Sequence, residues 1–276
     1  MKQLEVLMSV MHQSDFSIAY KSKIESDLLI VNQCDMNRYD EIEVDGHRWR
    51  MISTTERGLS KSRNLALDNA EGDICLLCDD DETFVPGYAE AILKAYEEIG
   101  DAGAVVFNVE RINYTMKKSY YKITQIREAP KYRGYSRQML SFDLEKIRAK
   151  GIRMSERFGS GTQWGGGEEI LFEEDIRRNG MKLYEHPFTI ATVDYAGGSA
   201  WFQGYDEKYF YNLGAFIGYQ FRRKPLLREL RILLTCYRLR REKKLSTLKK
   251  IRWMHVGGRQ FKKDVPFAVY MEGRKR

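Results

Sequence analysis

The chain has 276 residues, of which 43% are hydrophobic and 31% are charged, and its net charge is +7. This length allows one large domain, or one domain with an appendage, and the composition is that of a globular protein with a hydrophobic core. The charge is uneven, since residues 212–276 carry 19 lysines and arginines against four acidic residues, a balance of +15. Residues 1–211 have a balance of −8. An acidic body with a basic tail predicts that the tail faces a negatively charged surface.

The sequence argues against secretion and against membrane insertion. No stretch of about 18 apolar residues occurs, so no transmembrane helix is expected. The first residues lack the long apolar core of a signal peptide. The chain has four cysteines, too few to form a disulfide framework in a protein of this size. Cys75 and Cys78 lie three residues apart, so on a strand their side chains would point to opposite faces. We therefore expect a protein of the reducing cytoplasm in which this pair is structural.

Strands and helices alternate along the first 110 residues. Apolar runs predict strands at residues 4–11, 27–33, 74–78 and 104–109, with a weaker candidate at 50–54. Helices are expected from Ser60, as an N-cap, to about Asn69, and from Pro86 to Gly100. This alternation is typical of βαβ units and predicts an α/β fold with a doubly wound, mostly parallel sheet flanked by helices.

The second half of the chain is less regular. Residues 111–158 are rich in Tyr, Lys and Arg, and we expect an insertion of loops with two short antiparallel strands. A glycine-rich stretch, 159–167, precedes a helix that starts with Glu168 and Glu169, and a strand is expected at 188–193. The tail contains a segment with helical apolar spacing. One face of that helix would carry Leu226, Leu230, Leu233, Leu234 and Tyr237, and the other Arg228, Arg231 and Arg238.

Three consecutive aspartates, Asp79, Asp80 and Asp81, follow the strand predicted at 74–78. In open α/β sheets, ligands bind at the carboxyl ends of the strands, so these side chains are candidates for a site. Adjacent carboxylates repel one another unless a cation is close, and a hard divalent cation with oxygen ligands meets that need. A solvated acidic turn that caps the next helix is the alternative interpretation.

The order of the motifs resembles that of the family 2 glycosyltransferases, which have the GT-A fold. A first strand with Ser9 near its end and a second strand ending near Asp35 precede the stretch RGLSKSRN, which is similar to the family's rGls.aRN segment. The triple aspartate is similar to its D-x-D motif. The stretch GGGEEILF, about 90 residues later, resembles its Gly-Glu-Asp motif. The match covers residues 3–110 and 159–215.

The resemblance implies a glycosyltransferase domain over 1–211, followed by a basic, amphipathic helical tail over 212–276. Within the domain, residues 1–110 would bind the nucleotide sugar and residues 111–211 the acceptor. The chain departs from the family pattern in three places. Glu169 stands where Asp is usual, Asn32-Gln33 replaces a frequent pair of aspartates, and no His follows the acidic-pair helix as a metal ligand.

The activity implied by the resemblance is an inverting transfer from a nucleotide-diphospho sugar to a hydroxyl group. The acceptor would be a glycan or a polyprenyl-linked saccharide, in surface polysaccharide biosynthesis, and UDP is the commonest nucleotide in the family. Asp79 and Asp81 would hold Mn²⁺ or Mg²⁺, and Glu169 or Glu168 would be the catalytic base. The candidates for binding the donor nucleotide are Ser9, Met11, Asn32, Asp35, Arg57, Arg63, Asp79 and Asp80. The candidates for binding the acceptor are Trp164, Gly166, Gly167 and Trp201.

Other interpretations remain open. A nucleotidyltransferase also uses paired aspartates on a metal, but it usually has a glycine-rich loop after its first strand, where this chain reads SVMHQSDF. A non-catalytic protein that binds nucleotides is a second alternative. Nucleic-acid binding by the tail is a third, but no nucleic-acid partner is expected because the body is acidic and no recognised module is present. The tail also predicts peripheral docking on the inner, anionic face of the cell membrane, with an ordinary packed helix as the alternative.

Overall fold

The computed structural model describes residues 2–113, 121–131, 133–135, 139–195 and 204–274. The chain divides into two compact units. The first, here called the sheet unit, consists of residues 1–156 and 168–198, and the second, the helical unit, of residues 157–167 and 199–276. The boundary expected between residues 211 and 212 lies inside helix α6 (Glu207–Gln220).

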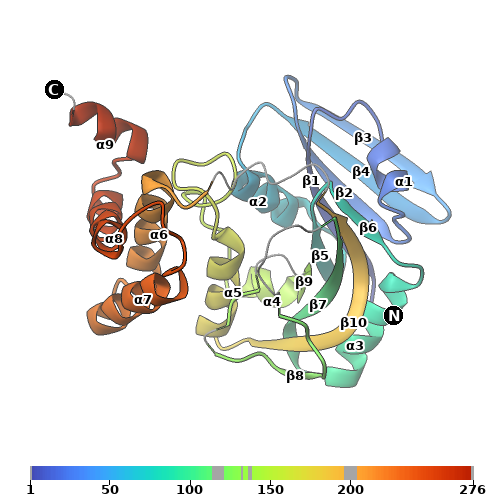
Figure 1. The fold of residues 1–276 in the computed structure, drawn as a ribbon. Coiled ribbons are helices and arrows are strands. Elements are labelled where there is room, and N and C mark those ends of the chain that lie inside the picture. The colour runs from blue at the N-terminus through green and yellow to red at the C-terminus, as the bar shows by residue number, and fades with distance from the viewer. Residues whose placement is uncertain (1, 114–120, 132, 136–138, 196–203, 275–276) are drawn as a thin grey trace. The chain divides into compact units, whose positions relative to one another are not determined.

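The sheet unit is organised around one ten-stranded mixed sheet with the order β3-β4-β2-β1-β5-β9-β7-β10-β6, and β8 pairs with β10 (Figure 1). The strands are β1 (Leu4–Met11), β2 (Asp27–Gln33), β3 (Arg38–Val44), β4 (His47–Thr54), β5 (Ile74–Cys78), β6 (Glu82–Phe84), β7 (Ala102–Ile112), β8 (Arg127–Glu128), β9 (Met139–Asp143) and β10 (Lys182–Asp194). Strands β4, β2, β1 and β5 run parallel to one another, and so do β7 and β10. Strand β9 lies antiparallel between β5 and β7.

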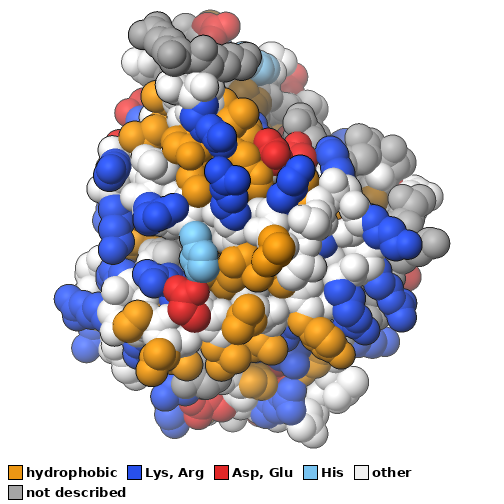
Figure 2. All heavy atoms as spheres, turned by 60° about the vertical axis from the view of Figure 1, so that its left-hand side comes forward, with side chains coloured by type: hydrophobic (Ala, Val, Ile, Leu, Met, Phe, Trp, Pro, Cys, Tyr) orange, Lys and Arg blue, Asp and Glu red, His pale blue; other side chains and the backbone are white. Residues whose placement is uncertain are grey.

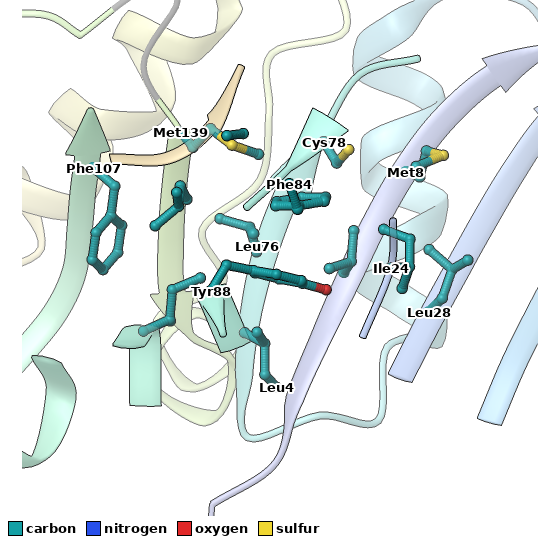
Figure 3. Close-up of a cluster of buried hydrophobic side chains, with 14 of the residues drawn as sticks. Leu4, Met8, Ile24, Leu28, Leu76, Cys78, Phe84, Tyr88, Phe107 and Met139 are labelled. Carbon is teal, nitrogen blue, oxygen red and sulfur yellow. The ribbon is translucent and has the colours of Figure 1, made fainter. Parts of the chain in front are cut away.

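Helices cover both faces of this sheet. One buried hydrophobic cluster joins the sheet to α1 (Ser17–Lys21) and α3 (Tyr88–Ile99). The other joins it to α2 (Leu59–Asn69), α4 (Leu144–Ala149) and α5 (Glu168–Arg178). These layers confirm the predicted α/β fold. Figure 3 shows part of the first cluster, in which Leu76 and Cys78 of β5 lie among side chains of β1, β6 and α3.

Strand β5 contributes to both clusters because successive side chains point to opposite faces. Cys78 belongs to the first cluster and Cys75 to the second, and both are free and buried. The expectation that this pair is structural is thereby confirmed. All five residues of the strand are buried, which explains why its sequence is a continuous apolar run.

Several features of the sheet unit differ from expectation. No strand was expected at β6, and β10 begins six residues before the strand expected at 188–193. Strand β3 was not predicted, because it is a largely exposed edge strand with a polar sequence. Residues 111–158 do contain two antiparallel strands, β8 and β9, but β9 lies in the middle of the sheet and is no part of an insertion. Helix α2 is capped by Gly58, and Ser60 lies buried in its first turn, so the N-cap predicted at Ser60 is wrong.

The helical unit contains α6, α7 (Pro225–Arg238), α8 (Thr247–Lys262) and α9 (Phe267–Gly273), in agreement with the predicted helical tail. Helices α6 and α8 approach closely where both carry glycines. A Cβ atom on Gly214 would lie 2.0 Å from the carbonyl oxygen of Met254, and one on Gly257 would lie 1.9 Å from that of Tyr211. No helix among the described residues is both long and apolar enough to cross a membrane.

Candidate active site

The triple aspartate forms a tight turn between β5 and β6. This turn lies at the carboxyl end of β5, as predicted from the sequence. The backbone N–H of Asp79 donates a hydrogen bond to Oε2 of Glu82 at 3.0 Å, which fixes the turn. Asp79 is half-buried, and Asp80 and Asp81 are exposed. The side chains are therefore presented at the carboxyl end of a buried parallel strand, the position at which open α/β sheets bind ligands.

Arg63 of α2 connects this turn to the start of α5. Its side chain is only 2% exposed. Its Nη2 lies 2.9 Å from Oδ1 of Asp79 and 3.2 Å from Oε1 of Glu169. Its Nη1 lies 3.6 Å from Oε1 of Glu168. We call these four residues the arginine-centred cluster, because one guanidinium contacts three carboxylates from two other parts of the sheet unit.

The charges in this cluster do not balance, since three carboxylates face one guanidinium. Burial alone would lower the pKa of Arg63, but the negative charges of Asp79, Glu169 and Glu168 raise it above its usual value. The pKa of Glu169 is raised to about 7, chiefly by burial; Arg63 opposes the rise, whereas the negative charges of Glu168 and Asp79 contribute to it. The site thus holds a fixed cation and a carboxyl group that titrates near neutral pH.

The two glutamates differ in their access to solvent. The side chain of Glu169 is 27% exposed and that of Glu168 is 8% exposed. Oε2 of Glu168 is buried and has no hydrogen-bond partner among the described residues. The sequence left open which of the two glutamates acts as the base. Their exposure favours Glu169, because a substrate can reach its side chain more easily.

Asn64, next to Arg63, ties α2 to the segment that leads into the glycine-rich stretch. Its Nδ2 donates to the carbonyl oxygen of Met154 at 3.0 Å, and its Oδ1 accepts from the N–H of Met154 at 2.9 Å. Nδ2 also lies 3.2 Å from Oε1 of Glu156. No role was expected for Asn64, although it lies in the RGLSKSRN stretch, and these contacts make it a positioning residue.

Three of the candidate donor-binding residues, Ser9, Met11 and Asn32, lie toward the carboxyl ends of β1 and β2. Oγ of Ser9 accepts a hydrogen bond from the hydroxyl of Ser62 at 2.9 Å, which links β1 to α2. The amide of Asn32 pairs with both backbone groups of Gln13, at 2.9 and 2.8 Å. Ser9 and Asn32 are buried and Met11 is exposed. Asn32 therefore shapes the loop after β1, and its contact with a nucleotide stays a prediction.

Asp35 and Arg57 form an ion pair beside this loop, with 2.7 Å between Oδ1 and Nη2. Nη1 of Arg57 also donates to the carbonyl oxygen of Cys34 at 2.7 Å, so the guanidinium is fixed to the chain after β2. Gln33 was assigned no role from the sequence, although Asn32-Gln33 stands out as a departure from the family pattern. Its Oε1 accepts from the N–H of Gly58 at 2.7 Å and so fixes the start of α2. The sequence signal that could have drawn attention to Gln33 is its position, at which the resembled family often has an aspartate.

The candidate acceptor-binding residues belong to the helical unit. Trp164 is 1% exposed and stacks on Tyr211, with 5.8 Å between ring centroids, and its edge meets Phe261 at 4.9 Å. Its ring is a core element that leaves no face for a sugar, which corrects the role expected from sequence. Gly166 is exposed, and a Cβ on Gly167 would lie 2.7 Å from the ring of Phe216. Trp201 lies outside the described residues.

The acidic turn fits a divalent cation by donor type and by charge. Its donors are carboxylate oxygens, which Mg²⁺ and Mn²⁺ prefer. Partial loss of hydration raises the pKa of Asp81 to about 6, and the negative charges of Asp79 and Asp80 add to the rise. In the part of the chain that the structure describes, no three His, Cys, Asp or Glu residues form a ready-made metal centre. A cation held here would take further ligands from a substrate or from water.

The mixed sheet, with an acidic turn after its central strand and an acidic pair opening a later helix, is the GT-A architecture. Residues 4–166, more than half of the chain, match the family model described as Glycosyl transferase family 2. The chain belongs to this family and is a glycosyltransferase. No curated protein sequence matches it.

Solved structures with the same fold include several of S. aureus TarS. The chain is 14% identical to TarS 1-349 in complex with UDP-GlcNAc, with a TM-score of 0.60, and the match covers 80% of this chain and 67% of that one. For TarS 1-349 in complex with UDP the identity is 12%, the TM-score 0.55, and the coverage 80% and 66%. For a longer TarS chain the identity is 13% and the TM-score 0.58, and the match covers 88% of this chain and 44% of that one. The chain thus spans about two thirds of the shorter TarS chains and less than half of the longer one, and the likeness shows the fold alone.

Proposed function

We propose that this glycosyltransferase transfers a sugar, with inversion, from a UDP-sugar to a hydroxyl of a glycan or lipid-linked saccharide. The observation that carries the proposal is the arginine-centred cluster, in which Arg63 joins Asp79 of the acidic turn to Glu169 of α5. The likeness to S. aureus TarS, which was crystallised with UDP-GlcNAc and with UDP, supports UDP as the nucleotide.

On the donor side, Asp79 and Asp81 would hold Mn²⁺ or Mg²⁺. When bound, such an ion neutralises the charge that develops on the diphosphate leaving group. Mg²⁺ is usually held by one or two carboxylates together with substrate phosphates, and Asp79 and Asp81 would supply two. Arg63 holds Asp79 by the hydrogen bond at 2.9 Å, so the orientation of this carboxylate is set before a ligand arrives.

On the acceptor side, Glu169 takes the proton of the attacking hydroxyl group. The hydroxyl oxygen forms a bond to the anomeric carbon while the bond from that carbon to the diphosphate oxygen breaks, and UDP leaves. A single displacement of this kind inverts the configuration at the anomeric carbon. A base is most effective when its pKa lies near the working pH, and the pKa of about 7 for Glu169 meets that condition.

Membership of the glycosyltransferase family favours glycosyl transfer over the nucleotidyl transfer considered from sequence. A family member that binds nucleotide sugars without transferring them is the remaining alternative. The two differ in one observable, the release of UDP that depends on a carboxylate at position 169.

The test combines binding and turnover. Melting temperatures are measured with UDP-sugars and, for comparison, GDP-sugars, each with and without Mn²⁺. A donor at 100 times its Kd stabilises the folded chain by about 2.7 kcal/mol, so the correct donor raises the melting temperature visibly. UDP release is then followed with that donor, using Glu169→Gln as control. Binding without release, or release that the variant retains, contradicts the proposal, as does a shift with GDP-sugars alone.

A further inference from the structure

Helix α7 of the helical unit carries an apolar stripe that the rest of the described chain does not cover. The stripe consists of Leu226, Leu227, Leu230, Leu233, Leu234 and Tyr237, whose side chains are 38–85% exposed. Its main members repeat at intervals of four, three and four residues, which places them on one side of a helix. Sequence analysis predicted this face, and the structure shows that it points to solvent.

The opposite side of α7 is the one that packs. Ile232 and Cys236 are buried, and Leu239, one turn further, is buried as well. Helix α7 therefore already has its packing face, and the exposed stripe is a second apolar face. Six exposed large hydrophobic residues on a 14-residue helix form a continuous patch, and patches of this kind mark interaction surfaces.

The charge around the stripe is strongly positive. Residues 222–252 contain 13 lysines and arginines and two glutamates, a balance of +11. The acidic residue within α7, Glu229, is paired with Arg228 at 2.9 Å and with His255 at 2.7 Å. Figure 2 shows hydrophobic side chains on this side of the molecule with Lys and Arg side chains around them. The surface thus combines apolar contact area with a field that attracts anions.

We propose that α7 docks on an anionic lipid membrane, with its leucine stripe inserted among the acyl chains and the flanking basic residues at the headgroups. Helix α7 has 14 residues and is about 21 Å long, shorter than the roughly 30 Å hydrocarbon core, so it lies in the membrane plane. Amphipathic helices with basic flanks bind in this way, by apolar insertion and by attraction to anionic lipid.

Charge distinguishes this occupant from two others. A second copy of the chain would bring a second positive surface against the first, and the two would repel each other. The phosphates of a nucleic acid could pair with the basic residues, but its polar sugar-phosphate backbone would not bury the exposed leucine side chains. Of these three occupants, an anionic membrane is the one that satisfies both the apolar and the basic parts of the surface.

The experiment is co-flotation of the full chain with vesicles, measured without any sugar nucleotide. Vesicles of phosphatidylcholine are compared with vesicles that contain 30% phosphatidylglycerol. We expect binding to the anionic vesicles that weakens as salt is raised. The double variant Leu230→Gln, Leu233→Gln should bind at least about tenfold more weakly, because two inserted side chains are lost. The double variant Lys243→Glu, Lys244→Glu should lose the preference for anionic lipid.

Val269→Gln is the matched control, because Val269 is an exposed apolar residue of α9 outside the stripe, and its binding should equal that of the wild type. Both leucines are exposed, so far-UV circular dichroism should show an unchanged fold. The proposal is overturned if the wild type does not float with anionic vesicles at low salt, or if the leucine variant floats as well as the wild type. Dimerisation that depends on the leucines, or retention on DNA in place of vesicles, also overturns it. None of these outcomes depends on glycosyl transfer.

Discussion

Asp79 and Glu169 accept hydrogen bonds from the same nitrogen atom, Nη2 of Arg63, at 2.9 and 3.2 Å. The two carboxylates come from a turn after β5 and from the first turn of α5, far apart in the sequence. Sharing one guanidinium fixes their separation, and neither carboxylate can reorient without affecting the other. The proposed donor side and the proposed acceptor side of the reaction are therefore joined through one buried cation.

Replacement of the two glutamates at the start of α5 distinguishes the base from its neighbour. Glu169→Gln should lower kcat by about 10²–10⁴-fold, the usual contribution of a positioned base, because the amide cannot take a proton. Donor binding should persist, since the change keeps the shape of the side chain and a hydrogen-bond acceptor for Arg63. The measurement is UDP release together with the donor-induced rise in melting temperature.

Glu168→Gln is the matched control, and we expect it to retain most of the rate because its side chain is buried. If Glu169→Gln is active and Glu168→Gln inactive, the proposal that Glu169 is the base is wrong, and Glu168 takes that role.

Asp81→Asn tests the acidic turn. The variant should lower metal-dependent turnover at least about tenfold, because one of two proposed metal ligands loses its charge. Without ligands it should melt at the same temperature as the wild type or higher, since the mutual repulsion of Asp79, Asp80 and Asp81 is reduced. Asp45→Asn, in the exposed turn between β3 and β4, serves as control. A Mn²⁺ titration of UDP release that is identical in Asp81→Asn and Asp45→Asn removes the metal-site proposal.

The elements that sequence predicted best are those whose pattern is local. Strand β5 is an apolar run because both of its faces are buried, and the triple aspartate marks the point where it leaves the sheet. The glycine-rich stretch and the acidic pair were likewise visible as motifs. The order of these motifs along the chain was enough to indicate the fold. It also singled out Arg63, Asp79 and Glu169, which the structure brings together and whose roles stay predictions.

The elements that sequence missed depend on long-range pairing or burial. Strand β9 follows a polar, basic segment, and only its hydrogen bonds to β5 and β7 make it a central strand. The central role of Arg63 requires three carboxylates from distant parts of the chain to meet, which no local pattern encodes. Trp164 was a candidate for binding the acceptor, but it is buried by contacts with Tyr211 and Phe261, which lie in helices much later in the chain.

Glu173→Gln should change how stability depends on pH. Glu173 of α5 is buried, and both of its carboxylate oxygens accept from the N–H of Tyr135 at 3.1 Å. Burial raises its pKa from 4.5 to about 8, although Arg177 lowers it. Between these values the unfolded chain loses the proton and the folded chain keeps it, so stability falls as pH rises from about 4.5 to about 8. The glutamine amide in Glu173→Gln does not titrate, so the variant lacks this loss of stability, which is on the order of 4 kcal/mol at most.

Urea unfolding at pH 5 and pH 8 provides the measurement, and the variant should lose less stability than the wild type between the two. The exposed Glu90 of α3 supplies a control, since Glu90→Gln should keep the pH dependence of the wild type. Equal pH dependence in all three proteins contradicts the assignment.

Gly214→Ala should destabilise the helical unit. The added Cβ would lie 2.0 Å from the carbonyl oxygen and 2.4 Å from the Cα atom of Met254, and backbone atoms of α8 cannot yield as a flexible side chain would. Helices α6 and α8 must therefore move apart, at a cost of about 1–3 kcal/mol, typical of overpacking. Gly273→Ala is the control, because a Cβ at this position of α9 meets nothing within 4 Å, and the change should be neutral or slightly stabilising. Urea midpoints followed by circular dichroism compare the two variants, and equal midpoints would mean that the close approach of α6 and α8 contributes nothing to stability.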